Sequence, residues 1–160
     1  MTKLRIGNGY DVHRLAADLP LFLGGVRIPH TLGAVAHSDG DVLLHALCDA
    51  LLGAAALGDI GQHFPDQDAT YKNIDSKILL QRTVKLLQDA GWRPVNADAV
   101  ICLQTPKIMS FIPMMREVLA PILGLPQTDI SIKATTTERL GFVGREEGLA
   151  AYAVCLIEAC

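Results

Sequence analysis

Two residues near the amino terminus combine a carboxylate and an imidazole at a spacing that suits metal binding. Asp11 and His13 lie in the stretch NGYDVHR, directly after the alternating run LRIG. Side chains two residues apart on a strand project from the same face, so both would point one way, with Val12 opposite. A carboxylate beside an imidazole suits a divalent metal ion. The alternative is an ordinary strand end, because D-x-H alone is too short to be a specific signature.

A second histidine could complete such a site from a helix. We predict a helix over about residues 40–57, where apolar residues recur at helical spacing, and His45 lies within it. If this helix packs over the strand, Asp11, His13 and His45 would supply three ligands and leave one position open, as in catalytic zinc sites. The alternative is that His45 is a solvated histidine on the helix surface.

The residues before this helix allow two interpretations. Ser38 and Asp39 suit the N-cap, and Gly58 suits the end of the helix. The free N–H groups and the dipole at a helix N-terminus also attract anions. His37 and the Ser38 hydroxyl therefore serve either as part of a cap or as contacts to a phosphate group.

Four carboxylates have less specific interpretations. Asp41 and Asp49 lie one turn on either side of His45, and either could accept a hydrogen bond from its other ring nitrogen. Asp66 and Asp68, in FPDQD, could act as general acid and base or accept hydrogen bonds from a hydroxylated substrate.

A hydroxyl-rich stretch, TTTE at 135–138, follows another predicted strand. Its hydroxyls and backbone N–H groups could hold phosphate oxygens, and Glu138 could ligate Mg²⁺. Lys107 and Arg145 are candidate counter-charges. The alternative is an ordinary polar loop. Together, these stretches indicate a metal-dependent enzyme that acts on a phosphorylated small molecule.

The elements that must position these residues follow from periodicity and turn signals. We predict strands at 4–12, at 20–28 (two short strands around Gly24-Gly25), at 95–103, at 129–135 and at 149–159, and helices at 40–57, about 75–90 and 110–123. We predict loops at 59–74, with a short turn of helix, and at 136–148. The nearly continuous apolar run of the last strand predicts burial on both faces. The order indicates one α+β domain over residues 1–160, with helices covering one face of a mixed sheet.

Composition excludes several classes of protein. Half of the 160 residues are hydrophobic, which is enough for a core and excludes disorder. The net charge of −3 and the scattered basic residues exclude a nucleic-acid-binding face. The amino terminus has no apolar signal stretch, and no run is long enough to span a membrane, so we expect a cytoplasmic protein. The four cysteines form no CxxC pair and are expected to be reduced and mostly buried.

The motifs in their order resemble one enzyme family. The segments RIGNGYDVHRL, LGGVRIP, AHSDGDVLLHALCDALLGAAALGDIGQHFPD, PKI, IPMMR and KATTTERLGFVGREEG carry this resemblance over almost the whole chain. The family is that of the 2-C-methyl-D-erythritol 2,4-cyclodiphosphate synthases of the non-mevalonate isoprenoid pathway. It implies a lyase of terpenoid biosynthesis in which the 2-phosphate of 4-diphosphocytidyl-2-C-methyl-D-erythritol 2-phosphate attacks the β-phosphorus, releasing CMP.

The resemblance also implies the roles of the polar residues. It makes Asp11, His13 and His45 ligands of one Zn²⁺ per subunit and Glu138 a ligand of Mg²⁺ or Mn²⁺, and it places His37 and Thr136 at the transition state. It assigns substrate contacts to Ser38, Asp59, Ile60, Gly61, Phe64, Pro65, Asp66, Asp68, Leu103, Gln104, Thr105, Pro106, Lys107, Ile108, Met109, Thr135, Thr137, Phe142 and Arg145.

The resemblance implies an assembly as well. The family is homotrimeric, with sheets packed around a threefold axis and active sites between subunits. Tyr10, Val12, Arg145 and Glu147 match positions that line an axial cavity, which in relatives can hold an isoprenoid diphosphate. The chain has no room for the cytidylyltransferase domain that is fused to some relatives, so we expect a monofunctional enzyme.

Two other functions compete with this one. The first is zinc-dependent hydrolysis of a phosphoester, in which water is the nucleophile and no cyclic product forms. The second is a non-catalytic trimer that binds isoprenoid diphosphates and uses its zinc structurally. In that case, substitution of Asp11 would unfold the trimer rather than only inactivate it.

Overall fold

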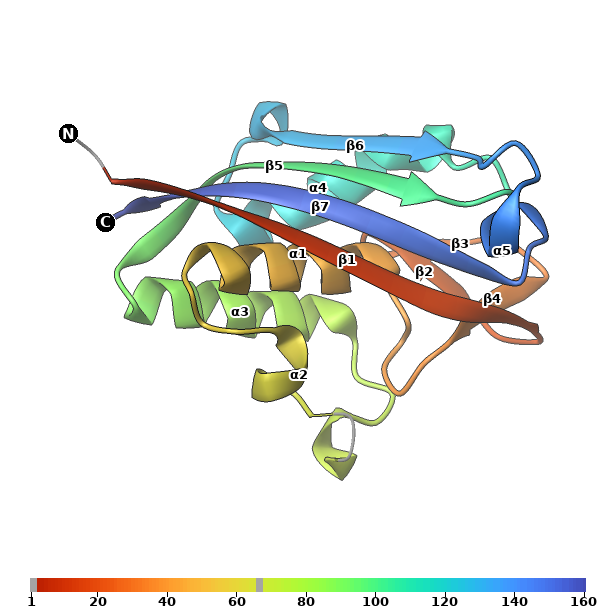
Figure 1. The fold of residues 1–160 in the computed structure, drawn as a ribbon, viewed down its shortest axis with the longest axis horizontal. Coiled ribbons are helices and arrows are strands. Elements are labelled where there is room, and N and C mark those ends of the chain that lie inside the picture. Colours follow the sequence, from red (N-terminus) through yellow and green to blue (C-terminus); the bar gives the residue numbers. More distant parts are fainter. Residues whose placement is uncertain (1–2, 66–67) are drawn as a thin grey trace.

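A five-stranded mixed sheet forms one layer of the protein, and helices pack on one of its faces (Figure 1). The structure is a computed structural model that describes residues 3–65 and 68–160. This architecture confirms the predicted α+β class with helices covering one face of a mixed sheet. No helix within the described ranges is long and apolar enough to cross a membrane.

The strands follow the order β4-β1-β7-β5-β6 across the sheet. They are β1 (Leu4–Ala17), β4 (Leu32–Val35), β5 (Trp92–Cys102), β6 (Ile130–Thr135) and β7 (Gly148–Ala159), and β2 (Leu21–Leu23) and β3 (Val26–Ile28) form a separate hairpin. Among the strand pairs of this sheet in the described ranges, only β5–β6 is parallel. The long strand β7 therefore lies at the centre of the sheet and pairs with both β1 and β5.

Helices connect these strands, and the longer ones lie along the covered face. They are α1 (Val42–Ala54), α2 (Ile60–His63), α3 (Ser76–Asp89), α4 (Ile112–Leu123) and α5 (Gly141–Gly144), with short 3-10 turns at Ala69–Tyr71, Met109–Phe111 and Gln127–Asp129. Helix α1 packs directly on β1 and β7, α3 covers α1, and α4 packs on β6. Since α1 has protein on almost every side, most of its residues are buried, including His45.

Two predicted features of α1 differ from the structure. The helix begins at Val42, and its N-cap is Asp41, whose carboxylate accepts the N–H of Leu44, rather than Ser38 or Asp39. The helix also ends before Gly58, with a C-cap at Ala55. Asp41 is preferred as the cap because its buried carboxylate accepts the N–H groups of Gly24 and Gly25 in the β2–β3 turn as well. One side chain thus joins the hairpin to the helix.

The strands of the structure are also longer and more numerous than the sequence predicted. Strand β1 continues to Ala17 because the unpredicted strand β4 pairs with its last residues. The short turn of helix predicted within 59–74 is confirmed by α2, whereas the loop predicted at 136–148 contains the unpredicted short helix α5. The helix predicted at 110–123 is divided into a 3-10 turn and α4, which ends at Gly124 in the left-handed conformation (φ 67°).

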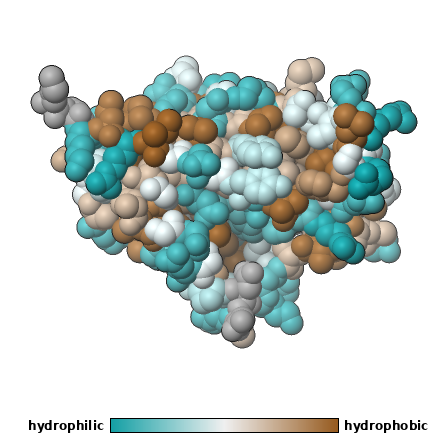
Figure 2. All heavy atoms as spheres, in the orientation of Figure 1, coloured by the Kyte–Doolittle hydropathy of each residue, from teal (hydrophilic) through white to brown (hydrophobic). Residues whose placement is uncertain are grey.

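The last strand is not buried on both faces along its whole length. Tyr152 and Val154 of β7 are 50% and 41% exposed, because they project from the face of the sheet that no helix covers. Leu4 and Ile6 of β1 are also exposed, and Ile6 pairs with Leu156 of β7. Figure 2 shows hydrophobic side chains gathered over the left-hand parts of β1 and β7. One chain alone therefore leaves an apolar sheet face open to solvent.

Candidate metal centre and neighbouring cavities

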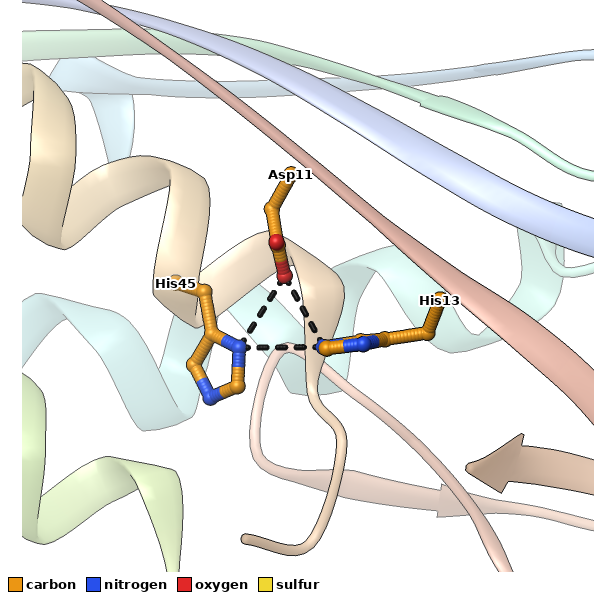
Figure 3. Close-up of side chains that lie close together, drawn as sticks. All are labelled: Asp11, His13 and His45. Atoms are coloured by element: carbon orange, nitrogen blue, oxygen red, sulfur yellow. Dashed lines mark hydrogen bonds and ion pairs between the residues drawn. The ribbon is translucent and has the colours of Figure 1, made fainter. Parts of the chain in front are cut away.

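Three side chains from two elements converge on one point (Figure 3). Asp11 and His13 project from β1, and His45 projects toward them from α1. Oδ2 of Asp11 lies 2.9 Å from Nε2 of His13 and 3.0 Å from Nδ1 of His45, and the two nitrogens are 3.1 Å apart. The strand alternation and the helix packing expected from the sequence thus place the three predicted ligands together.

Two glycines allow the helix to come this close to the strand. Gly7 and Gly9 lie on the same face of β1 as Asp11, since they share its alternation. A Cβ atom built on Gly9 would lie 2.0 Å from the carbonyl oxygen of Ala46, and one on Gly7 would lie 2.0 Å from that of Ala50. Because neither position has a side chain, β1 and α1 can pack at this short distance. The role of the two glycines was not predicted from the sequence.

The electrostatics of the cluster favour a negatively charged carboxylate. Burial by itself would raise the pKa of Asp11, but hydrogen bonds and charge interactions with His13 and His45 outweigh it and lower the pKa to about 2. For His45, burial opposes the charged imidazolium, whereas the hydrogen bond to Asp11 and the charges of nearby carboxylates raise its pKa above the ordinary value. In the absence of a metal ion, the Asp11 carboxylate is therefore ionised and favours a proton on His45, a position that a metal cation would take instead.

The donor set fits a zinc ion. A tetrahedral zinc ion with ligand bonds of about 2.0–2.1 Å holds its donor atoms roughly 3.3 Å apart, close to the distances between Asp11, His13 and His45. Two ring nitrogens that face each other at 3.1 Å cannot both carry a proton without repulsion. A bound cation would satisfy both lone pairs and the carboxylate together. Within the described ranges, these three residues form the one such group of potential ligands.

The contacts around His45 differ from those predicted. Its Nε2 atom lies 2.9 Å from Oγ of Ser76 and 3.1 Å from Oγ of Ser38. Asp41 caps α1 and Asp49 accepts the N–H of Ile60, so neither carboxylate contacts His45 as expected. The contact of Ser76 with His45 was not predicted, because Ser76 begins α3 and reaches His45 only through tertiary packing.

A cavity of about 330 Å³ opens beside the three ligands. Its lining includes the predicted residues Asp11, His13, His37, Ser38, His45, Ile60, Gly61 and Phe64, together with Val35, Ala36, Tyr71, Ile74 and Leu79, which were not predicted. Asp59, Pro65 and Asp68 are outside this lining, and the carboxylates of Asp59 and Asp68 cap short helical turns. Asp66 lies outside the described residues.

A second cavity, of about 370 Å³, contains most of the predicted nucleotide contacts. It is lined by Leu103, Gln104, Pro106, Lys107, Ile108, Met109, Thr135 and Thr136, with Ser110 and Ala134 in addition. Thr105, Thr137 and Glu138 do not line it. Oγ1 of Thr136 donates to Oε1 of Glu138 at 3.3 Å. The cavities are lined by different residues, so a single chain does not join the metal centre to the candidate nucleotide pocket.

The predicted axial residues lie on the open side of the sheet. Tyr10 stacks on Tyr152 with ring centroids 4.7 Å apart, and Val12 is exposed on the same strand. Arg145 and Glu147 form an exposed ion pair at 3.0 Å. Val12, Phe142 and Glu147 also line a third cavity. Their roles toward a ligand remain predictions.

Comparisons with known proteins agree with this fold. Residues 4–158 match the model of the YgbB family. A curated relative from Thioalkalivibrio sulfidiphilus, named 2-C-methyl-D-erythritol 2,4-cyclodiphosphate synthase, is 60% identical over 159 residues, which are 99% of each chain.

Two solved structures are also similar. The bifunctional IspDF from Campylobacter jejuni superposes with a TM-score of 0.96 at 43% identity, covering 100% of this chain and 43% of that one. A CDP-bound 2C-methyl-D-erythritol-2,4-cyclodiphosphate synthase superposes with a TM-score of 0.88 at 39% identity, covering 96% of this chain and 99% of that one.

These findings define first a class of protein, an α+β enzyme with an Asp-His-His ligand set between a strand and a helix. The chain belongs to the YgbB family, whose curated members similar to it are named as cyclodiphosphate synthases. The family identified from the sequence motifs is thereby confirmed.

Proposed function

We propose that this enzyme converts 4-diphosphocytidyl-2-C-methyl-D-erythritol 2-phosphate to 2-C-methyl-D-erythritol 2,4-cyclodiphosphate and CMP. An oxygen of the 2-phosphate forms a bond to the β-phosphorus, and the bond from that phosphorus to the bridging oxygen breaks, so that this oxygen leaves with CMP. The observation that carries the proposal is the convergence of Asp11, His13 and His45 beside a cavity, in a chain so similar to synthases of this name.

Asp11, His13 and His45 would hold zinc. A bound zinc ion is a Lewis acid and would polarise a phosphoryl oxygen. The chain's own residues position the reacting groups. Oγ of Ser38 accepts the N–H of Gly40, which leaves its hydroxyl proton free to donate to the 2-phosphate. His37 lines the same cavity and would donate to the phosphate oxygens as charge develops on them.

The remaining groups would bind the other parts of the substrate. Gly61 and Phe64, together with Ile60, would enclose the methylerythritol unit, and Asp59 and Asp66 would accept hydrogen bonds from its hydroxyl groups. The second cavity would hold the cytidine, with Lys107 as a counter-charge to the diphosphate. Glu138, with Thr136 beside it, would hold Mg²⁺ or Mn²⁺, which would neutralise negative charge on the diphosphate.

A homotrimer would bring these groups into one active site. Because the metal centre and the candidate nucleotide pocket are separate cavities in one chain, we propose that a neighbouring subunit supplies the nucleotide pocket. The open apolar face of the sheet, around Ile6 and Tyr152, would then pack around the threefold axis, with Arg145 available for an isoprenoid diphosphate there. A cytoplasmic location suits the four free cysteines.

The test is ³¹P NMR of the purified protein with this substrate, with and without Mg²⁺, for the parent and for His45→Ala. The matched control is His63→Ala. The imidazole of His63 is not one of the three ligands and donates a hydrogen bond to the carbonyl of Leu57. We expect the parent and the control to form CMP and a cyclic diphosphate and His45→Ala to form neither. Linear phosphate products would overturn the proposal in favour of zinc-dependent hydrolysis. No turnover by a folded, zinc-bound parent would favour a binding protein.

A further inference from the structure

A chain of hydrogen bonds extends from His45 away from the candidate metal centre. Nε2 of His45 lies 2.9 Å from Oγ of Ser76, and Oγ of Ser76 lies 2.5 Å from Oδ1 of Asp39. Ser76 is fully buried at the start of α3. The three residues come from α1, α3 and the loop before α1, so tertiary structure alone brings them together.

The direction of each hydrogen bond follows from the chemistry of its partners. A carboxylate only accepts, so the single hydroxyl proton of Ser76 is donated to Asp39. The Ser76 oxygen can then only accept a hydrogen bond from His45. The Nε2 atom of His45 must therefore carry a proton and donate it to this hydrogen bond. When the His45 ring is neutral, as a metal ligand must be, the proton on Nε2 leaves the free lone pair on Nδ1, the atom that faces Asp11 and His13.

The carboxylate of Asp39 is itself held in place. Its Oδ2 atom accepts the N–H of Ser76 at 3.0 Å, and its Oδ1 atom accepts the N–H of Asp41 at 3.2 Å. The N–H of Asp39 donates to the carbonyl of Ile74 at 3.1 Å. Asp39 therefore joins the start of α3 to the start of α1, and its charge is aimed at the Ser76 hydroxyl.

We propose that Ser76 and Asp39 are positioning residues that hold the His45 imidazole in the tautomer and orientation that present Nδ1 to a metal ion. This inference rests on the proposed metal centre and adds two residues to it. Hydrogen bonds of this kind fix ring orientation and raise the basicity of a ligand, and their loss typically lowers metal affinity about 10–100-fold.

Ser38, the other hydroxyl near Nε2, has a different role in this scheme. It lies at a longer distance, 3.1 Å, and already accepts the N–H of Gly40. It also lines the cavity beside the ligands, whereas Ser76 does not. Ser76 and Asp39 thus orient His45 from behind, and Ser38 remains available to the substrate.

The test measures Zn²⁺ affinity by competition with a chromophoric chelator, for the parent, Ser76→Ala and Asp39→Asn. The control is Thr83→Val, which removes another fully buried hydroxyl from the same helix. We expect a loss of affinity of at least about 10-fold for Ser76→Ala, a smaller loss for Asp39→Asn, and none for the control. Thermal unfolding of the metal-free proteins shows whether each variant folds.

A second readout is specific to orientation. In the zinc-loaded parent labelled with ¹⁵N on histidine, we expect the proton on Nε2 of His45 to exchange slowly with solvent, and to exchange faster in both variants. Unchanged zinc affinity and unchanged proton exchange in Ser76→Ala and Asp39→Asn would overturn this proposal and leave the metal centre intact. A folded parent that binds no zinc would instead overturn the metal centre, and this proposal with it.

Discussion

At the scale of single residues, the proposed function depends on three donor atoms that lie about 3 Å from one another. The spacing of Asp11 and His13 on a strand was enough to predict that both face one way, and His45 was predicted to join them from a helix. Ser76 was not predictable, because nothing near it in the sequence indicates that α3 starts beside the imidazole of His45.

Replacing the shared carboxylate tests the metal centre without changing its size. Asp11→Asn removes the negative charge that both histidines face, so we expect zinc content to fall and kcat to drop at least about 100-fold, since metal ions contribute several kcal/mol to such reactions. Elemental analysis and CMP release measure the two effects. The control is Asp89→Asn, an exposed carboxylate paired with Lys85. A variant that retains full zinc content and rate would contradict the assignment.

At the scale of elements, the close contact between β1 and α1 determines where His45 lies. Gly9→Ala would place a methyl group 2.0 Å from the carbonyl oxygen of Ala46, so the helix must move away. Such overpacking costs about 1–3 kcal/mol, and we expect zinc affinity to fall as well because His45 moves with α1. Urea unfolding and zinc titration measure both quantities.

Gly53→Ala is the matched control for this change. Gly53 lies on α1, the helix that packs against Gly9, but it is exposed. A Cβ atom there would lie 4.0 Å from its nearest neighbour, the carbonyl oxygen of Asn8. Since alanine favours a helix more than glycine, by up to about 1 kcal/mol, we expect equal or greater stability. Equal stability of Gly9→Ala and the parent would show that the close approach does not constrain the site.

The buried N-cap Asp41 makes the stability of this contact depend on pH. Burial raises the pKa of its carboxyl to about 6, although three backbone N–H groups act in the opposite direction. Because this folded-state pKa exceeds the ordinary value of 3.8, the carboxyl contributes stability below about pH 4. As the pH rises through about 6, this contribution is lost, which lowers the free energy of unfolding by roughly 3 kcal/mol.

Urea unfolding of the metal-free protein between pH 5 and pH 7.5 checks this dependence. We expect Asp41→Asn to unfold with a weaker pH dependence than the parent, because the titrating group is gone. The exposed Asp89→Asn should retain the parent's dependence. The idea fails if Asp41→Asn and the parent lose the same free energy of unfolding over this range.

Periodicity predicted the type and approximate position of most elements but not how their ends are determined. The N-cap of α1 was assigned to Ser38 and Asp39, because the contact of Asp41 with the β2–β3 turn is not local in sequence. Strand β4 was missed because four residues are too few for a periodic pattern. The role of Gly7 and Gly9 became visible only when α1 was seen to lie on them.

At the scale of the whole molecule, the apolar outer face of the sheet explains an error in the sequence analysis. The apolar run of β7 predicted burial on both faces, and in one chain Tyr152 and Val154 are exposed. Burial of this face between subunits would reconcile the two. The proposed trimer would also supply each metal centre with a nucleotide pocket from its neighbour.

Sedimentation velocity tests this assembly. We expect the parent to sediment as three copies of the 17.2 kDa chain. Ile6→Asp, which places a charge on an apolar side chain that is 70% exposed on the open face, should shift it toward one copy and lower activity. Ile78→Asp, on α3, is the control and should remain a trimer. A parent that sediments as one copy at working concentrations would rule out the shared active site.

The reaction itself is best tested with isotopically labelled water. The substrate is converted in H₂¹⁸O by the zinc- and Mg²⁺-loaded protein, and CMP and the second product are analysed by mass spectrometry. Intramolecular attack by the 2-phosphate predicts a cyclic diphosphate with no ¹⁸O in either product, because every oxygen comes from the substrate. A linear product that carries one ¹⁸O atom would show that water is the nucleophile and would contradict the proposed cyclisation.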